Sequence, residues 1–293
     1  MEPNLRKDVD RTPDGIKLHA PEDFAGMRAA GALAARILDE IAPHVAPGVK
    51  TGELDEIIHE KIIEAGATPA TLGYRGYTKS SCISINHVVC HGIPGNPVPK
   101  TKSETISRDL EKRRDDDRLL TGDVLNIDVT VILDGWFGDT SRMYVAGKPK
   151  GPASRLIDIT HEALMRGISV VRPGARFGDI GHAIQSYVEG ERCSVVRDFC
   201  GHGLGRVFHD SPSVVHYGRS GTGPEMRPGM FFTIEPMVNL GRPETKILDD
   251  GWTAVTRDKS LSAQFEHSVG VTEDGVEIFT LSPAGRFHPT WDR

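Results

Sequence analysis

Two runs of apolar residues in the middle of the chain predict a β-hairpin. The runs VLNIDVTVIL (124–133) and WFGDTSRMYV (136–145) flank the dipeptide Asp134-Gly135. An Asp-Gly pair between two strand-like runs is typical of a two-residue turn. Such a turn sets the register of the strands, so the residue numbers of each facing pair should sum to 269.

This register brings two aspartates together. Asp139 should face Thr130, and Asp128 should lie on the same face as Thr130 because side chains alternate along a strand. Asp128 and Asp139 are then diagonal neighbours, about 7–8 Å apart at the backbone. At that separation their carboxylates can bind a common cation, and without a cation they repel each other.

Asp128 also interrupts an otherwise apolar run, which predicts that it is buried. An isolated aspartate in a hairpin is more often an ordinary exposed residue. A buried carboxylate without a partner, however, costs on the order of several kcal/mol. A bound metal is the simplest compensation.

Three further metal-ligand candidates lie in the C-terminal part of the chain. They are His202 in CGHGLG, Glu235 in MFFTIEPMV and Glu266 in AQFEHSVGV, and both glutamates interrupt strand-like runs. Each of the three, taken alone, is more often a structural or solvated side chain. Together with the aspartates they form an oxygen-rich set with one imidazole, which suits Mn, Fe, Co or Zn and lacks the thiolates of a closed structural zinc site.

An internal repeat indicates the architecture. PGVKTGELDEII (47–58) and PGARFGDIGHAI (173–184) match at an offset of 126 residues. Each copy is typical of a helix end, a Pro-Gly turn and a new helix with an acidic first turn. We interpret the chain as a duplication in which each half supplies two helices followed by strands. Two copies of this size are too few for a solenoid.

Composition limits the class of protein. The chain has 293 residues, 38% of them hydrophobic, which suffices for one large domain or two fused halves. Its net charge of −6 gives no global sign of binding to nucleic acid or to an anionic membrane. No apolar run reaches the length of a membrane span, and the N-terminal residues lack an apolar stretch for export. We therefore expect a cytoplasmic protein with reduced cysteines and with neither DNA nor a membrane as a partner.

Longer motifs around these candidates resemble a known family. The chain is similar to the methionine aminopeptidases of the first, bacterial class, within the creatinase-like metallopeptidase family. The similarity lies in the segments KSSCISINHVVCHGIP, LNIDVTVILDGWFGDTS, FCGHGLGRVFHDSPSVVHY, PGMFFTIEPMVN, DGWTAVT and LSAQFEHSVGVT. The spacing of 33 residues between His202 and Glu235 leaves no room for the helical insertion of the second class.

The resemblance implies a fold and a division of the chain. The fold is the pseudo-two-fold pita-bread fold, an α/β (α+β) architecture with a curved antiparallel sheet inside and helices outside. We expect an N-terminal extension at residues 1–20 and a single catalytic domain at 21–293. The domain should consist of two repeated halves, at about 21–146 and 147–285, with the metal site between them.

The resemblance also implies a reaction, the metal-dependent removal of the N-terminal methionine from nascent proteins and peptides with a small second residue. Two divalent ions, Co, Mn, Fe or Zn, are expected to share a bridging hydroxide that attacks the first peptide bond. The implied ligands are Asp128, Asp139, His202, Glu235 and Glu266, with Asp139 and Glu266 bridging the ions.

Other residues receive roles from the same resemblance. Glu235 is expected to move a proton, His91 to contact the scissile amide nitrogen, and His209 to contact the carbonyl oxygen. The methionine side chain needs an apolar, polarizable pocket. The residues expected to form it are Tyr74, Tyr77, Cys82, Phe199, Phe208 and Trp252. Phe199 replaces a tyrosine that is common in relatives, and Thr71 replaces a cysteine.

One segment departs from the family pattern. Residues 95–118 hold seven Lys or Arg and six Asp or Glu, where relatives have a short connection. This composition is typical of a solvated surface loop. A sharper hypothesis is a transient contact with ribosomal RNA, made to its phosphates by Lys112, Arg113 and Arg114.

Two other functions fit the same fold. One is an exopeptidase that cleaves before proline, as Xaa-Pro aminopeptidases do, and the other is a non-catalytic module that binds the ribosome or RNA. A complete ligand set with His91 and His209 favours catalysis, because binding alone does not require it. The expected partners are nascent polypeptide N-termini, and we expect a monomer.

Overall fold

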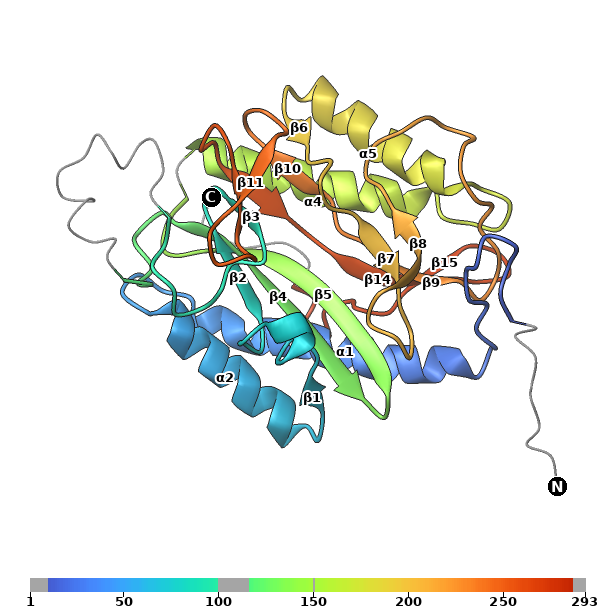
Figure 1. Ribbon diagram of the computed structural model, residues 1–293, viewed down its shortest axis with the longest axis horizontal. Helices are drawn as coiled ribbons and strands as arrows, with labels where there is room; N and C mark the ends of the chain where they lie inside the picture. The colour runs from blue at the N-terminus through green and yellow to red at the C-terminus, as the bar shows by residue number, and fades with distance from the viewer. Residues whose placement is uncertain (1–9, 100–115, 150, 287–293) are drawn as a thin grey trace.

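The computed structural model describes residues 10–99, 116–149 and 151–286 (Figure 1). The first part of the chain supplies two long helices and then a series of strands. These elements are α1 (Asp23–Ile41), the 3-10 helix η1 (Ala42–His44), α2 (Thr51–Glu64), β1 (Thr68–Pro69), the 3-10 helix η2 (Tyr74–Gly76), β2 (Cys82–Ile85), β3 (Val88–Cys90), β4 (Val124–Leu133) and β5 (Trp136–Val145).

The second part repeats this order of helices followed by strands. Its elements are α4 (Gly151–Ser169), α5 (Phe177–Gly190), β6 (Ser194–Val195), β7 (Gly201–Gly203), β8 (Asp210–Val214), β9 (Phe231–Ile234), β10 (Met237–Asn239), β11 (Thr245–Ile247), β12 (Ala254–Thr256), β13 (Ser262–Gln264), β14 (His267–Val271) and β15 (Val276–Ile278). Within the described ranges, none of the helices combines the length and the apolar character of a membrane span.

The two helices predicted from the repeat form at the same offset as the sequence match. Helices α2 and α5 are each 14 residues long and follow a Pro-Gly turn. The backbone N–H of Lys50 donates to the Glu53 carboxylate at 3.1 Å, and that of Arg176 donates to Asp179 at 2.8 Å. An acidic side chain that binds the N-cap amide satisfies one of the free N–H groups at a helix start. The acidic first turn predicted for both helices is therefore confirmed.

The central hairpin has the predicted register. Strand β4 pairs with β5 so that Thr130 faces Asp139, and Asp128 faces Ser141. The turn residues Asp134 and Gly135 have φ angles of 50° and 79°. Two consecutive positive φ angles belong to the turn type whose twist matches that of the flanking strands.

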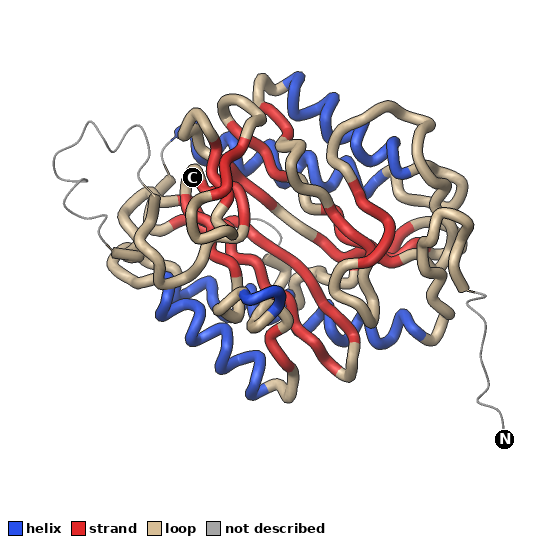
Figure 2. The backbone as a smooth tube through the Cα atoms, viewed as in Figure 1, coloured by secondary structure: helices blue, strands red, loops and turns tan. Residues whose placement is uncertain are grey.

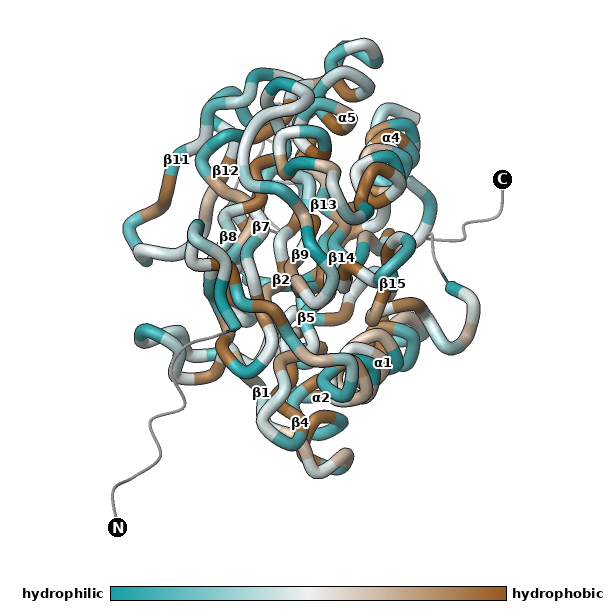
Figure 3. Tube along the Cα trace, turned by 90° about the vertical axis from the view of Figure 1, so that its right-hand side faces the viewer, coloured by the Kyte–Doolittle hydropathy of each residue, from teal (hydrophilic) through white to brown (hydrophobic). Residues whose placement is uncertain are grey.

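The strands lie in the middle of the molecule and all their pairings are antiparallel. Hydrogen bonds divide them into a four-stranded sheet (β1, β4, β2, β5), a five-stranded sheet (β15, β14, β9, β7, β8) and two three-stranded sheets (β13, β10, β6 and β11, β12, β3). Helices α1 and α2 cover one side of the strands, and α4 and α5 cover the opposite side (Figures 2 and 3). This is the predicted class of fold, with antiparallel strands inside and helices outside.

Each helix pair has its own hydrophobic core. Leu38 of α1, Ile58 of α2 and Ile127 of β4 belong to one cluster, and Leu164 of α4 and Ile180 of α5 belong to another. All five side chains are buried. A fully buried aliphatic side chain stabilises a fold by about 1.5–3 kcal/mol, so both clusters contribute strongly to the stability of the fold.

Polar contacts join the two halves at the centre. Glu266 forms an isolated bridge with Ser141 of β5, and its backbone N–H donates to the Ser141 carbonyl at 3.1 Å. The Ser268 hydroxyl of β14 donates to the carbonyl of Asp139 at 2.6 Å. The backbone of the first-half hairpin is thereby held against the second-half strands where the candidate metal ligands lie.

Candidate metal centre and active site

The predicted site residues meet in one cavity of about 690 Å³. Both halves line it, and every residue that we predicted for the site is among the lining residues. These are Tyr74, Tyr77, Cys82, His91, Asp128, Asp139, Phe199, His202, Phe208, His209, Glu235, Trp252 and Glu266. A concave site with a few convergent polar groups is the usual form of an active site.

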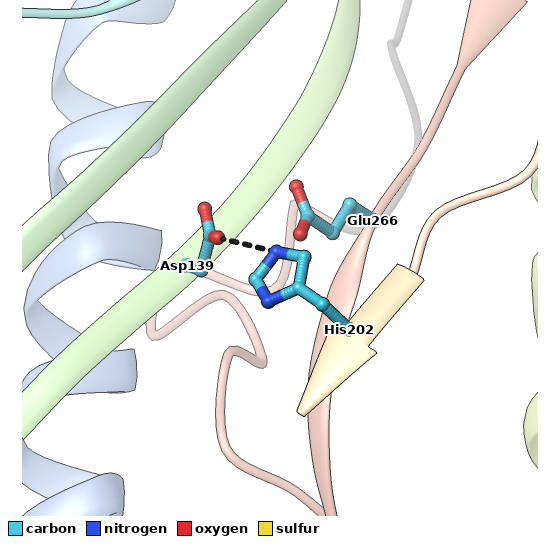
Figure 4. A group of neighbouring side chains, drawn as sticks. All are labelled: Asp139, His202 and Glu266. Carbon is cyan, nitrogen blue, oxygen red and sulfur yellow. Dashed lines mark ion pairs between the residues drawn. The ribbon is translucent and has the colours of Figure 1, made fainter. Parts of the chain in front are cut away.

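Three of the candidate ligands converge most closely. One ligand atom each of Asp139, His202 and Glu266 lie within 4.8 Å of one another. Figure 4 shows the two carboxylates pointing toward the imidazole, with Asp139 on β5 and His202 on β7. The Nε2 atom of His202 is 3.5 Å from Asp139 Oδ2 and 3.7 Å from Glu235 Oε1. Three of the five predicted ligands therefore form one close group, and Glu235 lies beside its histidine.

The tautomer of His202 fits metal binding. Its Nδ1 lies 3.1 Å from the carbonyl oxygen of Gly203, which can only accept a hydrogen bond, so Nδ1 carries the proton. Against the effect of burial, the carboxylates of Asp139 and Glu235 raise the pKa of His202, and in its neutral form the lone pair of Nε2 faces them. A histidine whose other nitrogen donates to a carbonyl is the common arrangement of a metal ligand.

Asp128 supplies the observation that most directly calls for a cation. Its Oδ1 atom is buried and has no hydrogen-bond partner among the described residues. Burial raises its pKa well above the usual range, and the charges of Asp139 and Glu235 raise it further. A buried carboxylate without a donor is stable when a metal neutralises it.

The two glutamates lie in breaks between strands. Glu235 connects β9 to β10, and Glu266 connects β13 to β14. Burial raises the pKa of Glu235 to about 7, and burial followed by the Asp139 charge raises that of Glu266. In both places a strand ends next to the glutamate, and the glutamate lines the cavity.

Neighbouring side chains hold Glu235 in place. Its Oε1 accepts a hydrogen bond from the Thr233 hydroxyl at 2.7 Å, and its Oε2 accepts one from Gln264 Nε2 at 3.3 Å. Its backbone N–H donates to Nε2 of His216 at 3.0 Å. These contacts orient the carboxylate toward His202.

His91 and His209 lie at the edge of this acidic group. Burial lowers the pKa of His91, while burial and then the charge of His202 lower that of His209 to about 4. Both imidazoles are therefore neutral at pH 7 and can donate one hydrogen bond each. The His209 ring lies 4.1 Å from the His202 ring, centroid to centroid, so it is next to the candidate metal ligands.

Aromatic side chains form two walls of the cavity. Tyr74 contacts Phe208 at 4.9 Å and His209 at 5.2 Å between ring centroids. On the other wall, His91 lies 5.4 Å from Phe199 and 6.1 Å from Trp252 in edge-to-face arrangements. Aromatic faces and edges of this kind suit an apolar, polarizable side chain.

Tyr77 and Cys82 also line the cavity. Tyr77 packs edge-to-face on Trp252 at 5.1 Å, and its hydroxyl donates to the carbonyls of Ser81 and Gly92. Cys82 of β2 faces Asp128 of β4, and burial raises the pKa of its thiol. A protonated thiol next to an aspartate is a small apolar group rather than a nucleophile.

Comparison with known proteins places the chain in a family. The model described as Metallopeptidase family M24 matches residues 25–273. The chain belongs to metallopeptidase family M24. As an M24 protein it binds a divalent metal, and the buried acids of the cavity are the residues whose chemistry fits that requirement.

Relatives with high identity cover nearly the whole chain. A methionine aminopeptidase of Rickettsia prowazekii is 55% identical over 277 residues, which are 94% of this chain and 99% of the relative. The methionine aminopeptidase of Escherichia coli K12 is 51% identical over 268 residues, 91% of this chain and 94% of the relative.

Solved structures agree with the sequence relatives. A crystal structure of the Rickettsia prowazekii methionine aminopeptidase matches with a TM-score of 0.83 at 56% identity and covers 91% of this chain and 100% of that one. The prolidase of Pyrococcus horikoshii matches with a TM-score of 0.64 at 18% identity, covering 90% of this chain and 63% of that one, which shows a common fold alone.

The structure of this M24 protein adds residues that sequence reasoning assigned no site role. His216 is fully buried, and its Nε2 accepts a hydrogen bond from the backbone amide of Glu235. Arg75, Asp198 and Gln264 line the cavity as well. No local signal marked them, because their positions depend on which strands and turns meet in the folded chain.

Proposed function

We propose that this chain is a methionine aminopeptidase, which removes the N-terminal methionine from nascent proteins and peptides whose second residue is small. The observation that carries the proposal is the convergence of four carboxylates, two buried and two largely buried, and one imidazole in a single cavity. The chain around them is 55% identical over 94% of its length to a protein named methionine aminopeptidase.

The proposed metal ligands are Asp128, Asp139, His202, Glu235 and Glu266. We propose that they would hold two divalent ions, Co, Mn, Fe or Zn, and that Asp139 and Glu266 would contribute to both sites. In support, these four carboxylates face one another in a buried space, where only a comparable positive charge would make their joint ionisation favourable. When bound, such ions lower the pKa of water toward ~7 and polarise a peptide carbonyl.

The remaining polar residues act on the substrate. We propose that His209 donates a hydrogen bond to the carbonyl oxygen of the first peptide bond, where negative charge develops during hydrolysis. His91, on the other wall, contacts the amide nitrogen of the same bond. Glu235 transfers the proton to the leaving amine, because its carboxylate is held in the cavity by Thr233 and Gln264.

The aromatic walls are the proposed pocket for the methionine side chain. Cys82 and the rings of Tyr74, Tyr77, Phe199, Phe208 and Trp252 supply its apolar surface. A thioether favours contact with aromatic edges, so this lining suits methionine better than a charged first residue.

The direct test uses purified protein from which metal has been removed. It is assayed on the peptides Met-Ala-Ser and Ala-Pro-Ala, with Mn, Co, Fe or Zn added in turn. We expect free methionine from the first peptide only when metal is present, and none from Asp139→Asn. Cleavage of Ala-Pro-Ala alone would support the exopeptidase that acts before proline, and no turnover with any metal would support the binding module.

The monomeric state, the cytoplasmic location and the ribosome contact remain predictions. The proposed RNA-binding residues Lys112, Arg113 and Arg114 lie outside the described residues. Support for that contact comes from composition alone, since residues 95–118 hold seven basic side chains. Deletion of residues 100–115 should weaken ribosome binding most strongly at low salt, and equal binding by the deletant would contradict the contact.

A further inference from the structure

A short turn beside the cavity holds an arginine in a sparsely populated backbone conformation. Arg75 lies within the 3-10 turn Tyr74–Gly76 and has φ 47° and ψ 30°. Its neighbours Gly73 and Gly76 also have positive φ angles, of 84° and 88°. Backbone outliers on residues other than glycine persist where the surrounding structure imposes them, and they are common at functional sites.

The turn places Arg75 close to the proposed reaction. The ring of Tyr74 stacks on that of His209, with 5.2 Å between the centroids and 21° between the planes. Arg75 itself lines the cavity, and its guanidinium lies over the Tyr74 ring at 5.3 Å. A substrate carbonyl bound by His209 would therefore have the next residues of its chain near this guanidinium.

Two other charged residues of the cavity, Asp210 and Asp198, accept hydrogen bonds, but only Asp210 accepts them from a cation. Asp210 receives two hydrogen bonds from the Arg11 guanidinium, at 3.1 and 2.7 Å. Asp198 accepts a hydrogen bond from the Thr245 hydroxyl at 2.6 Å. Within the described part of the chain, Arg75 is exposed and makes no ion pair. Its positive charge is thus available to a ligand.

Arg75 and Asp198 are exposed, make no ion pair within the described residues, and adjoin different aromatic side chains of the cavity. Arg75 adjoins Tyr74, which contacts Phe208 and His209. Asp198 adjoins Phe199, which contacts His91. The cavity lining therefore carries an exposed cation beside one group of aromatic rings and an exposed carboxylate beside another.

We propose that Arg75 determines specificity: it favours substrates with an acidic side chain directly after the small second residue. The inference rests on the proposed function, since it assumes that the methionine enters the cavity and the rest of the peptide leaves past the turn. Asp198 has the opposite effect and disfavours the same substrates. The preference is electrostatic, because the Arg75 guanidinium is exposed and can meet a flexible side chain.

The expected effect is modest and depends on salt. An exposed ion pair of this kind changes an equilibrium by about two- to five-fold. The screening length falls from about 10 Å at 0.1 M salt to about 3 Å at 1 M. The preference for an acidic over a neutral peptide should therefore be clear at low salt and absent at 1 M.

The test compares C-terminally amidated peptides, so that no terminal carboxylate competes. Met-Ala-Glu-Ala, Met-Ala-Gln-Ala and Met-Ala-Lys-Ala amides are measured in two ways. The first is kcat/KM of the metal-loaded enzyme. The second is the Kd of metal-depleted protein, followed by the tryptophan fluorescence to which Trp252 of the cavity contributes.

The variants distinguish an effect of the Arg75 charge from an effect of a changed fold. Arg75→Gln should remove the preference for the Glu peptide over the Gln peptide, and Arg75→Lys should keep most of it. Asp198→Asn should increase it. Arg166→Gln is the matched control, because Arg166 also lies over a tyrosine ring, Tyr187, and is exposed on α4, outside the cavity. Thermal melting of each variant reports whether the turn still folds.

The outcomes distinguish the inference from the proposed function. Turnover of the Gln peptide without a preference for the Glu peptide overturns the inference and leaves the function standing. A binding preference that depends on Arg75, in a protein that releases no methionine with any metal, supports the inference and overturns the function. An equal preference in wild type and in a folded Arg75→Gln variant also overturns the inference.

Discussion

The two halves of the molecule build the same helical frame but deliver their metal ligands differently. The first half supplies Asp128 and Asp139 from two strands of ten residues each, joined by a two-residue turn. The second half supplies His202, Glu235 and Glu266 from short strands or the breaks between them. In a regular hairpin, the turn and the alternation of side chains determine where each side chain lies. At a break between strands, the position of a side chain depends on tertiary contacts with other segments.

The buried ion pair of the first half, which also binds Ser282 of the second half, should have the largest effect on stability. Asp39 of α1 is buried, pairs with Arg142 of β5 at 2.7 Å and accepts the Ser282 hydroxyl. Asp39→Ala leaves the Arg142 charge buried without a partner, so the free energy of unfolding should fall by about 3–5 kcal/mol. Denaturant unfolding measures this loss of stability.

Glu40→Ala is the control for this prediction, because it removes a partly exposed partner of Lys61. It should cost less than about 1 kcal/mol, and equal losses for the two variants would contradict the assignment.

Removing one ligand from either half tests whether the halves contribute to one centre. Asp128→Asn and Glu266→Gln should each lower kcat/KM by more than about 100-fold, because even residues that only support a metal ligand cost 10- to 100-fold. In the metal-free protein both variants should melt at a higher temperature than wild type, since each removes a buried carboxylate with a raised pKa. Lower melting temperatures for both metal-free variants would mean that these carboxylates stabilise the fold without metal.

The second half supplies its ligands from short strands and breaks between strands. Its ligands should therefore depend more on residues that hold them in place. His216→Leu removes the acceptor of the Glu235 amide at a fully buried position. We expect metal affinity to fall by about 10- to 100-fold, together with a loss of about 1–3 kcal/mol of stability from the unpaired N–H. Calorimetric titration with Mn and thermal melting measure the two effects. An unchanged metal affinity in a folded variant would show that His216 does not position Glu235.

The smallest effect compares the equivalent helix starts. The Asp179 carboxylate accepts hydrogen bonds from the Arg176 and Gly221 amides and the Ser220 hydroxyl. Glu53 binds the Lys50 amide at the other helix. At pH 7, Asp179→Asn should cost about 1 kcal/mol and Glu53→Gln a few tenths. Denaturant unfolding of both variants at pH 7 tests this ranking, and equal losses of stability would contradict it.

The Asp179 effect should depend on pH with a defined sign. The Ser220 hydrogen bond, followed by those of the two amides, lowers the pKa of Asp179 below its ordinary value of 3.8. A lowered pKa in the folded state stabilises the protein above the unfolded pKa, and the contribution is lost as the pH falls through the folded value. The difference between wild type and Asp179→Asn should therefore be full at pH 7 and shrink below about pH 4.

Much of the site could be predicted because its signals are local. The Asp134-Gly135 turn and the alternation of side chains placed Asp128 and Asp139 together, and the paired strands have that register. The roles of the ligands and of His91 and His209 came from the resemblance to a family and remain predictions. At Glu235 and Glu266 the sequence showed only a polar residue within an apolar run. The same pattern occurs in a continuous strand, so the sequence did not reveal that the strands end there.

By itself the sequence determined the hairpin register, the two equivalent helix starts and the set of candidate ligands, because turn chemistry, side-chain alternation and capping act over a few residues. The tertiary structure alone decided that β5 and β7 bring Asp139 and His202 within 3.5 Å, that His216 holds Glu235, and that Arg75 lies at the cavity. These positions depend on packing between segments far apart in the chain, which no local pattern of residues specifies.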